Sequence, residues 1–117
     1  IPGFAFDGNR VVDSTGALAF REVPRRFVVI GGGYIGMEIG TLYAKLGSKV
    51  TIVEALPGVL PGTDPEIAQV VARKLKKLGI DAVTSAKAKG WEEKGDHARV
   101  LLETVAGEAS IPADKLL

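Results

Sequence analysis

The chain has 117 residues, of which 46% are hydrophobic and 25% are charged, and its formal net charge is +1. These values are typical of one soluble globular domain with a modest core, and they give no sign of a nucleic-acid or membrane surface. Cysteine is absent and the single histidine is His97, so we expect no disulfide, no thiolate chemistry and no metal site. No apolar run is long enough to cross a bilayer, and there is neither a start methionine nor a signal peptide. The abrupt ends of the sequence suggest a piece of a longer protein.

Residues 1–26 show no regular periodicity, and we predict a lead-in that packs along the edge of a sheet. Within it we expect a short extended piece at residues 11–12. One helical turn is expected in residues 14–20, with Ser14 or Thr15 as its N-cap.

The strongest pattern is a glycine-rich turn between a strand predicted over residues 27–30 and a helix predicted over residues 34–46. Gly31, Gly33 and Gly36 have the spacing G-x-G-x-x-G, which is typical of a dinucleotide-binding turn in this context. The first glycine allows a sharp turn, the second lets backbone approach a pyrophosphate, and the third lets the helix pack closely on the strand. The unpaired N–H groups and the positive dipole end of the helix favour a phosphate there.

The next predicted strand, residues 50–53, is followed directly by an acid, Glu54. In this position a carboxylate accepts hydrogen bonds from the ribose hydroxyls of adenosine. Such charge-assisted bonds contribute roughly 1.5–3 kcal/mol each. The same carboxylate repels a 2′-phosphate, and residues 55–58 include no Arg or Lys to receive one. The pattern therefore favours NAD over NADP.

Both predicted helices have apolar residues at helical spacing. In the first helix these are Ile35, Ile39, Leu42 and Leu46, with Gly40 permitting close packing and Gly47 ending the helix. The second helix follows a proline-glycine loop at residues 57–62 and begins at Thr63 or Asp64 as the cap, with Pro65 in its first turn. Its expected buried stripe is Ile67, Val71, Leu75 and Leu78, and Gly79 ends it. The basic residues Arg73, Lys74, Lys76 and Lys77 are interpreted as its solvated face.

A third strand over residues 80–84 completes a sheet that right-handed crossovers would make parallel. The pattern then changes to short antiparallel strands, expected at residues 87–93, 98–104 and 109–112, with Trp91 in the core of this meander. The expected fold class is α/β, a Rossmann-like β-α-β-α-β parallel sheet with an appended antiparallel β-meander.

Nearly the whole chain closely resembles the NAD-binding domain of the dihydrolipoamide dehydrogenases, which are flavoproteins of the pyridine nucleotide-disulphide oxidoreductase family. The resemblance is carried by residues 14–18 (STGAL), 28–40 (VVIGGGYIGMEIG), 46–54 (LGSKVTIVE), 75–80 (LKKLGI) and 114–117 (DKLL). It implies that residues 1–26 are a lead-in segment from an adjoining FAD domain. Residues 27–117 would then be the NAD-binding domain, truncated before its last strand.

The resemblance implies a two-electron relay from a dihydrolipoyl group through a cysteine pair and FAD to NAD. The FAD-binding motif, the cysteine pair and the catalytic histidine–glutamate dyad have no counterpart here, and His97 does not match the dyad. We therefore expect no catalytic residue in this chain, which should bind NAD without catalysing the reaction alone. The implied partners of the full-length parent are the lipoyl domain of a 2-oxoacid dehydrogenase complex and a second copy in a homodimer. The implied location is the cytoplasm, or the mitochondrial matrix in a eukaryote.

The cofactor-binding residues that the resemblance implies share one neighbourhood, the glycine turn and the strand ends around it. They are Gly31, Gly33, Tyr34, Ile35, Gly36, Glu38, Glu54 and Ala88. Tyr34 matches an aromatic that gates the nicotinamide pocket in some relatives, and Glu38 matches an acid near the nicotinamide and flavin. Because they are four apart, both lie on one helix face. Ala88 matches a small apolar residue beside the adenine.

Several alternatives remain open at this point. The glycines could serve packing alone, Glu38 could be a solvent-facing helix residue, and Tyr34 could be a capping aromatic. The parent could be another flavoprotein disulphide reductase, of the mercuric or glutathione type. The chain could instead be a non-catalytic nucleotide-sensing module, or its turn could bind FAD, although the long lead-in disfavours FAD.

Overall fold

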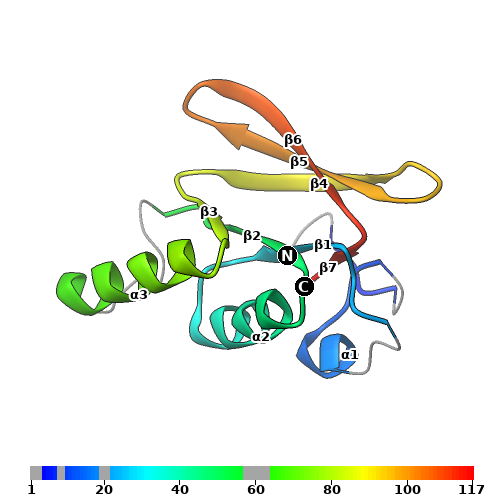
Figure 1. The fold of residues 1–117 in the computed structure, drawn as a ribbon. Coiled ribbons are helices and arrows are strands. Elements are labelled where there is room, and N and C mark those ends of the chain that lie inside the picture. The colour runs from blue at the N-terminus through cyan, green and yellow to red at the C-terminus, as the bar shows by residue number, and fades with distance from the viewer. Residues whose placement is uncertain (1–3, 8–9, 19–21, 57–63) are drawn as a thin grey trace.

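The structure is a computed structural model that describes residues 4–7, 10–18, 22–56 and 64–117 (Figure 1). Its elements are α1 (Ser14–Leu18), β1 (Arg26–Ile30), α2 (Tyr34–Lys45), β2 (Lys49–Val53), α3 (Pro65–Lys77), β3 (Asp81–Val83), β4 (Lys87–Glu93), β5 (Ala98–Thr104), β6 (Gly107–Ala113) and β7 (Lys115–Leu116). In the described part of the chain, no helix has both the length and the apolar character needed to cross a bilayer. The order of these elements confirms the α/β class and the appended meander.

Two sheets form the fold. The parallel sheet has the strand order β3-β2-β1-β7, and the antiparallel sheet has the order β4-β5-β6. Figure 1 shows the three helices on one face of the parallel sheet and the meander across its other face. The predicted parallel core had three strands. The structure adds a fourth, β7, which pairs in parallel with β1 through Phe27 with Lys115 and Val28 with Leu116.

The parallel sheet is buried on both faces, and this explains its nearly continuous apolar strands. Phe27 and Val29 of β1 point into the core under the helices, together with Val50 and Ile52 of β2. Val28 points into a second core, under the meander. The two cores are built by the alternation of side chains along one strand.

The lead-in packs along the sheet edge, as predicted. Val11 forms a parallel bridge with Leu116, and the Val12 N–H donates to the Leu116 carbonyl at 2.9 Å. The predicted cap of the first helical turn is wrong, because Ser14 and Thr15 lie inside α1. The Asp13 carboxylate accepts from the Gly16 N–H at 2.8 Å instead. Aspartate, serine and threonine can all accept from the free N–H groups of a first helical turn. Residue type alone therefore does not distinguish Asp13 from Ser14 or Thr15 as the cap.

The buried face of α2 differs from its apolar stripe. Met37, Ile39, Gly40 and Tyr43 are buried, whereas Ile35, Leu42 and Leu46 are exposed. The helix presents its glycines to the sheet. A Cβ built on Gly40 would lie 3.4 Å from Val50 Cγ1 and 3.6 Å from Val29 Cγ2. Of the apolar residues at helical spacing, only Ile39 is buried. Glycine adds nothing to a hydrophobic pattern, yet it permits the closest approach between helix and sheet.

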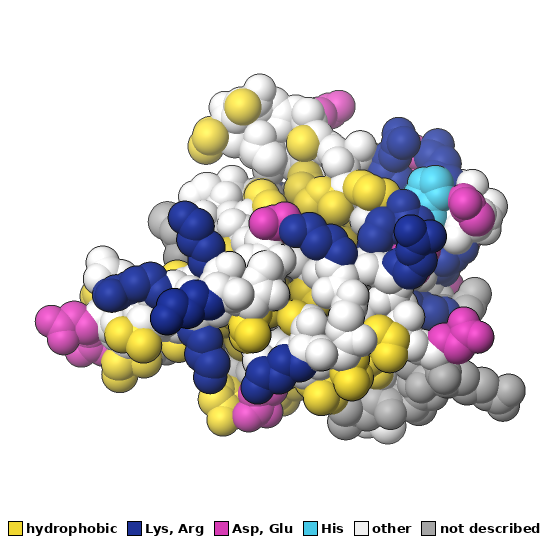
Figure 2. Space-filling model, in the orientation of Figure 1, with side chains coloured by type: hydrophobic (Ala, Val, Ile, Leu, Met, Phe, Trp, Pro, Cys, Tyr) yellow, Lys and Arg dark blue, Asp and Glu magenta, His cyan; other side chains and the backbone are white. Residues whose placement is uncertain are grey.

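α3 begins at Asp64, whose carboxylate accepts from the Glu66 N–H at 2.8 Å, with Pro65 at the first helical position. The loop over residues 57–62 and the alternative cap Thr63 lie outside the described residues. The predicted stripe is buried only in its second half, because Leu75 is buried while Ile67 is exposed. The basic residues of α3 are exposed and lie among the dark blue side chains of Figure 2.

The meander follows its predicted strands closely, since β4 and β5 have the expected bounds and only β6 is longer. Trp91 is partly buried against the second core and pairs across the ladder with Val100. Arg10 connects the lead-in to the meander and to the start of β7. Its side chain donates to both carboxylate oxygens of Glu93, at the end of β4, and to the carbonyl of Asp114.

Candidate functional site

The glycine turn joins β1 to α2 at the carboxyl end of the parallel sheet. Gly31 has φ +98°, a left-handed conformation that glycine adopts without strain. Its N–H donates to the Val53 carbonyl at 2.6 Å, which ties the turn to the end of β2. A Cβ on Gly36 would lie 2.8 Å from Val29 Cγ1 and 3.0 Å from the Gly31 carbonyl oxygen. The third glycine is therefore required where helix and strand pack closely.

Gly33 is the N-cap of α2 and has a different role. Its φ is −77°, and no side chain in the described part of the chain caps the helix by accepting from its first N–H groups. A Cβ built on Gly33 would meet nothing within 4 Å. The position is open to a ligand, and the free N–H groups and the helix dipole make it suitable for an anionic group.

Glu54 lies directly after β2, on the other side of the turn. Its side chain is buried, with 8% exposed. Oε1 accepts from the Gly32 N–H at 2.8 Å, and Oε2 accepts from the Leu56 N–H at 2.9 Å. A carboxylate offers about four lone-pair sites, so these two bonds orient Glu54 and leave capacity for hydroxyl donors.

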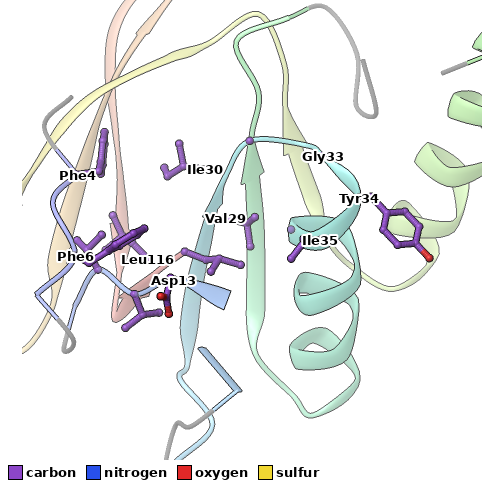
Figure 3. A pocket seen from close by; sticks show the side chains of 14 residues that line it. Phe4, Phe6, Asp13, Val29, Ile30, Gly33, Tyr34, Ile35 and Leu116 are labelled. Carbon is purple, nitrogen blue, oxygen red and sulfur yellow. The ribbon is translucent and has the colours of Figure 1, made fainter. Parts of the chain in front are cut away.

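A cleft of about 620 Å³ adjoins the turn, at the end of β1 and β7 (Figure 3). From β1 the chain passes through α2 to β2 on one side, whereas β7 pairs on the other side, so the strand order reverses between β1 and β7. In open α/β sheets, ligands bind outside the carboxyl ends of the strands at such a switch point. The cleft walls are Phe4, Phe6, Val11, Val12, Asp13, Val29, Ile30, Gly31, Gly33, Tyr34, Ile35, Gly36, Leu116 and Leu117.

The structure therefore brings five predicted site residues to one cleft, namely Gly31, Gly33, Tyr34, Ile35 and Gly36. It also shows wall residues that the sequence analysis did not select, chiefly Phe4 and Phe6 of the lead-in. Their alternation was visible in the sequence. No spacing rule relates a lead-in to a turn that follows it by two dozen residues, because only tertiary packing joins them.

Tyr34 and Glu38 share a face of α2, as predicted, and this face borders a groove of about 500 Å³ between α2 and α3. Tyr34 also borders the cleft, but Figure 3 shows its ring pointing away from Phe4 and Phe6, and the residue is 70% exposed. The hydrogen bond from its hydroxyl to the Glu38 carboxylate raises the pKa of Tyr34. In this conformation the aromatic ring does not cover the cleft.

Ala88 is set apart from the other predicted site residues. It lies in β4 and is partly buried against the second core, and it does not line the cleft. His97 pairs with Asp96 in the turn between β4 and β5, at 2.6 Å. Within the described ranges, no group of three or more His, Cys, Asp or Glu side chains could hold a metal ion.

Comparisons with known proteins cover the whole chain. Residues 1–117 match the family described as pyridine nucleotide-disulphide oxidoreductase. The chain is 48% identical over 117 residues to a dihydrolipoyl dehydrogenase of Geobacillus stearothermophilus and 46% identical to one of Staphylococcus aureus. All of this chain is aligned, but it spans only 25% of the length of either relative.

Solved structures give the same result. The HOCl-induced flavoprotein disulfide reductase RclA from Escherichia coli superposes with a TM-score of 0.84 at 36% identity, over 100% of this chain and 26% of that one. LpdA from Mycobacterium tuberculosis superposes with a TM-score of 0.87 at 25% identity, over 100% of this chain and 25% of that one. The sequence comparison and the structural comparison therefore both point to the pyridine nucleotide-disulphide oxidoreductases.

Proposed function

Because the chain belongs to the pyridine nucleotide-disulphide oxidoreductase family, we propose that it binds NAD and presents the nicotinamide for hydride transfer in a longer flavoenzyme. Members of this family are FAD- and NAD-dependent disulphide oxidoreductases, and their relay needs one site for each cofactor. The glycine turn and Glu54 are the features of this chain that suit NAD.

The hydrogen bond from the Gly32 N–H to the Glu54 carboxylate is the observation that carries this proposal. It holds the acid proposed to bind the ribose directly beside the turn proposed to bind the pyrophosphate. The open position at Gly33 and the uncapped start of α2 suit the pyrophosphate, and the carboxylate of Glu54 suits the adenosine ribose. The residues present thus fit a dinucleotide.

Each residue has a positioning task in this proposal. The N–H groups at the start of α2 fix the pyrophosphate, and Glu54 fixes the adenosine end, so the other end extends along the cleft. When bound, the nicotinamide ring supplies the hydride acceptor, and the protein supplies orientation. Ile35 and the apolar walls around it exclude water from that end of the cleft.

We assign the parent to the dihydrolipoamide dehydrogenases, which would make the reductant a dihydrolipoyl group on a lipoyl domain and the assembly a homodimer. The two dihydrolipoyl dehydrogenase relatives support this assignment over a mercuric or glutathione type of reductase. In such a parent, residues 1–26 would lead in from the FAD domain and residues 27–117 would form the NAD-binding domain. Tyr34 would gate the nicotinamide pocket, Glu38 would lie near the nicotinamide and flavin, and Ala88 would lie beside the adenine.

A titration tests the binding proposal directly. NADH and NADPH are added separately to the chain while nicotinamide fluorescence is followed. We expect saturable NADH binding and weaker NADPH binding, since Glu54 opposes a 2′-phosphate. Equal or tighter NADPH binding would contradict the role assigned to Glu54. The absence of binding of either nucleotide by a chain that shows cooperative unfolding would contradict the proposed function.

A further inference from the structure

A third hollow, separate from the cleft and from the groove between α2 and α3, lies at the adenosine end of the proposed site. It measures about 440 Å³ and is lined by Ala55, Ser85, Lys87, Lys89, Glu103, Thr104 and Val105. Ala55 directly follows Glu54, so the cavity begins next to the residue that would hold the ribose. It therefore lies where groups attached to the adenosine would project.

Backbone hydrogen bonds fix the position of this cavity relative to Glu54. The Ala86 N–H donates to the Glu54 carbonyl at 3.0 Å, and the Ser85 N–H donates to the Leu56 carbonyl at 2.9 Å. The segment after β3 is thus held against the segment after β2. It carries the chain directly into β4, where both lysines lie.

The cavity carries an excess of positive charge. Lys89 Nζ lies 2.7 Å from Glu103 Oε2, so one lysine is paired. Lys87 stands opposite Glu103 in the β4–β5 ladder, but it forms no salt bridge with any described residue. The cavity lining therefore contains two ammonium groups and one carboxylate. The side chains of Lys89 and Glu103 are about half exposed, at 50% and 55%, and Lys87 is exposed as well, so both lysines can turn toward an added anion.

We propose that Lys87 and Lys89 form an anion subsite that receives a phosphate on the adenosine ribose, and that Glu54 alone keeps NADP out. This inference rests on the proposed function, because it places the adenosine at Glu54. A phosphate monoester carries nearly two negative charges at neutral pH and accepts strong hydrogen bonds from ammonium groups. Residues 55–58, directly after Glu54, include no basic residue, but the fold supplies two from β4.

The test compares NADH and NADPH affinities by fluorescence titration of four variants. Glu54→Gln removes the opposing charge and keeps the size of the side chain. NADPH should bind this variant roughly tenfold more tightly than it binds the unmodified chain, the effect of one charge-assisted contact that solvent partly screens. Adding Lys87→Met and Lys89→Met together to Glu54→Gln should remove that gain. NADH affinity should differ little between Glu54→Gln and the variant that also carries Lys87→Met and Lys89→Met.

Two further arms separate a binding role from a structural one. Glu54→Gln with Glu103→Gln frees Lys89 and should tighten NADPH further, by a few-fold, which no loss of folding could produce. Glu54→Gln with Lys76→Met, an exposed lysine of α3, is the matched charge control and should keep the full gain. If Glu54→Gln does not fold, Lys87→Met with Lys89→Met in the unmodified chain serves instead, and it should weaken NADPH binding while it leaves NADH binding nearly unchanged.

The outcomes are distinct. If the unmodified chain binds no NADH, the proposed function is wrong and this subsite falls with it. If NADH binds but NADPH affinity is the same with and without Lys87 and Lys89 in the Glu54→Gln background, the proposed function stands and the subsite is wrong. A gain that Lys76→Met removes equally would also overturn the subsite, because it would reflect net charge alone.

Discussion

Glu54 and Gly32 are 22 residues apart in the sequence, yet Glu54 Oε1 lies 2.8 Å from the Gly32 nitrogen and accepts its hydrogen bond. The same carboxylate accepts from Leu56 at 2.9 Å through its second oxygen. One buried acid thus connects the end of β2 to the glycine turn. It therefore fixes the position of the turn relative to the end of β2.

We expect Glu54→Ala to destabilise the chain in the absence of any nucleotide. The substitution leaves the N–H groups of Gly32 and Leu56 without their acceptor, at a cost of about 1–3 kcal/mol. Urea unfolding followed by circular dichroism measures this difference. Glu54→Gln keeps an acceptor oxygen for one of the two N–H groups and should cost less. Equal costs for the two variants would show that the bonds to the backbone do not matter for stability.

Gly36→Ala and Gly33→Ala should have opposite effects on folding and ligand binding. The added methyl group at Gly36 would lie 2.8 Å from Val29 Cγ1, so helix and strand must separate, at a cost of roughly 1–3 kcal/mol. The methyl group at Gly33 would meet no atom of the described residues within 4 Å, so stability should change little. In NADH titrations, however, Gly33→Ala should weaken binding, because the methyl group occupies the approach of the pyrophosphate.

Adding Val29→Ala to Gly36→Ala provides the control. If the contact with Val29 causes the loss of stability, the double variant should cost less than the sum of the two single variants. Strict additivity would show that Val29 is not the obstacle. A Gly33→Ala variant that unfolds like Gly36→Ala would contradict the open geometry at the start of α2.

Asp114 should make stability depend on acid pH. Its carboxylate accepts from the Arg26 N–H, Nε and Nη2, at 2.9, 3.1 and 3.1 Å, and the hydrogen bond with the Arg26 side chain lowers the pKa of Asp114. A lowered pKa means that the stabilising effect is complete above the pKa of the unfolded chain and is lost as the pH falls through the folded one. Asp114→Ala should therefore cost more free energy of unfolding at pH 7 than near pH 3.

Urea unfolding at several pH values measures this cost for Asp114→Ala. Asp64→Ala serves as a comparison, since Asp64 is exposed and accepts one N–H at the start of α3. A cost for Asp114→Ala that does not change with pH would mean that the pair with Arg26 is not formed in solution.

The order of the elements and the glycine turn could be predicted from the sequence because each depends on local chemistry. Gly47 and Gly79 end their helices with φ +106° and +75°, conformations that glycine adopts at little cost, so a glycine after an apolar periodicity marks the end reliably. The strands β4 and β5 were equally clear, since turn residues bound them and their side chains alternate. The register of Glu54 with the turn followed from the same local patterns.

Other features depend on packing, which has no local signal. Two glycines of α2 meet the sheet, whereas Ile39 is the only residue of the expected apolar stripe that is buried. Phe4 and Phe6 reach the cleft because Val11 pairs with Leu116 across the length of the chain. The fourth strand, β7, is two residues long and is defined by its partner β1. Lys87 and Lys89 come close to Ala55 only through the turn after β3.

Glu38→Gln should lower the pKa of Tyr34. The hydrogen bond from the tyrosine hydroxyl to the Glu38 carboxylate stabilises the protonated phenol, and the nearby negative charge opposes its ionisation, so both causes raise the pKa of Tyr34. Removing the charge should bring ionisation of Tyr34 back toward its ordinary pH range. Tyrosinate absorbance measured against pH follows it. The chain has only one other tyrosine, Tyr43, whose burial also raises its pKa, so a Tyr43→Phe background isolates the signal of Tyr34.

Glu66→Gln, on another helix, is the matched control and should leave the Tyr34 titration unchanged. The same Glu38→Gln variant should alter NADH affinity by less than about twofold, since Glu38 does not line the cleft and solvent screens its exposed charge. A titration curve identical to that of the unmodified chain would mean that Tyr34 and Glu38 do not meet in solution. A large loss of NADH affinity would place this helix face in the binding site and overturn the assignment of the cleft.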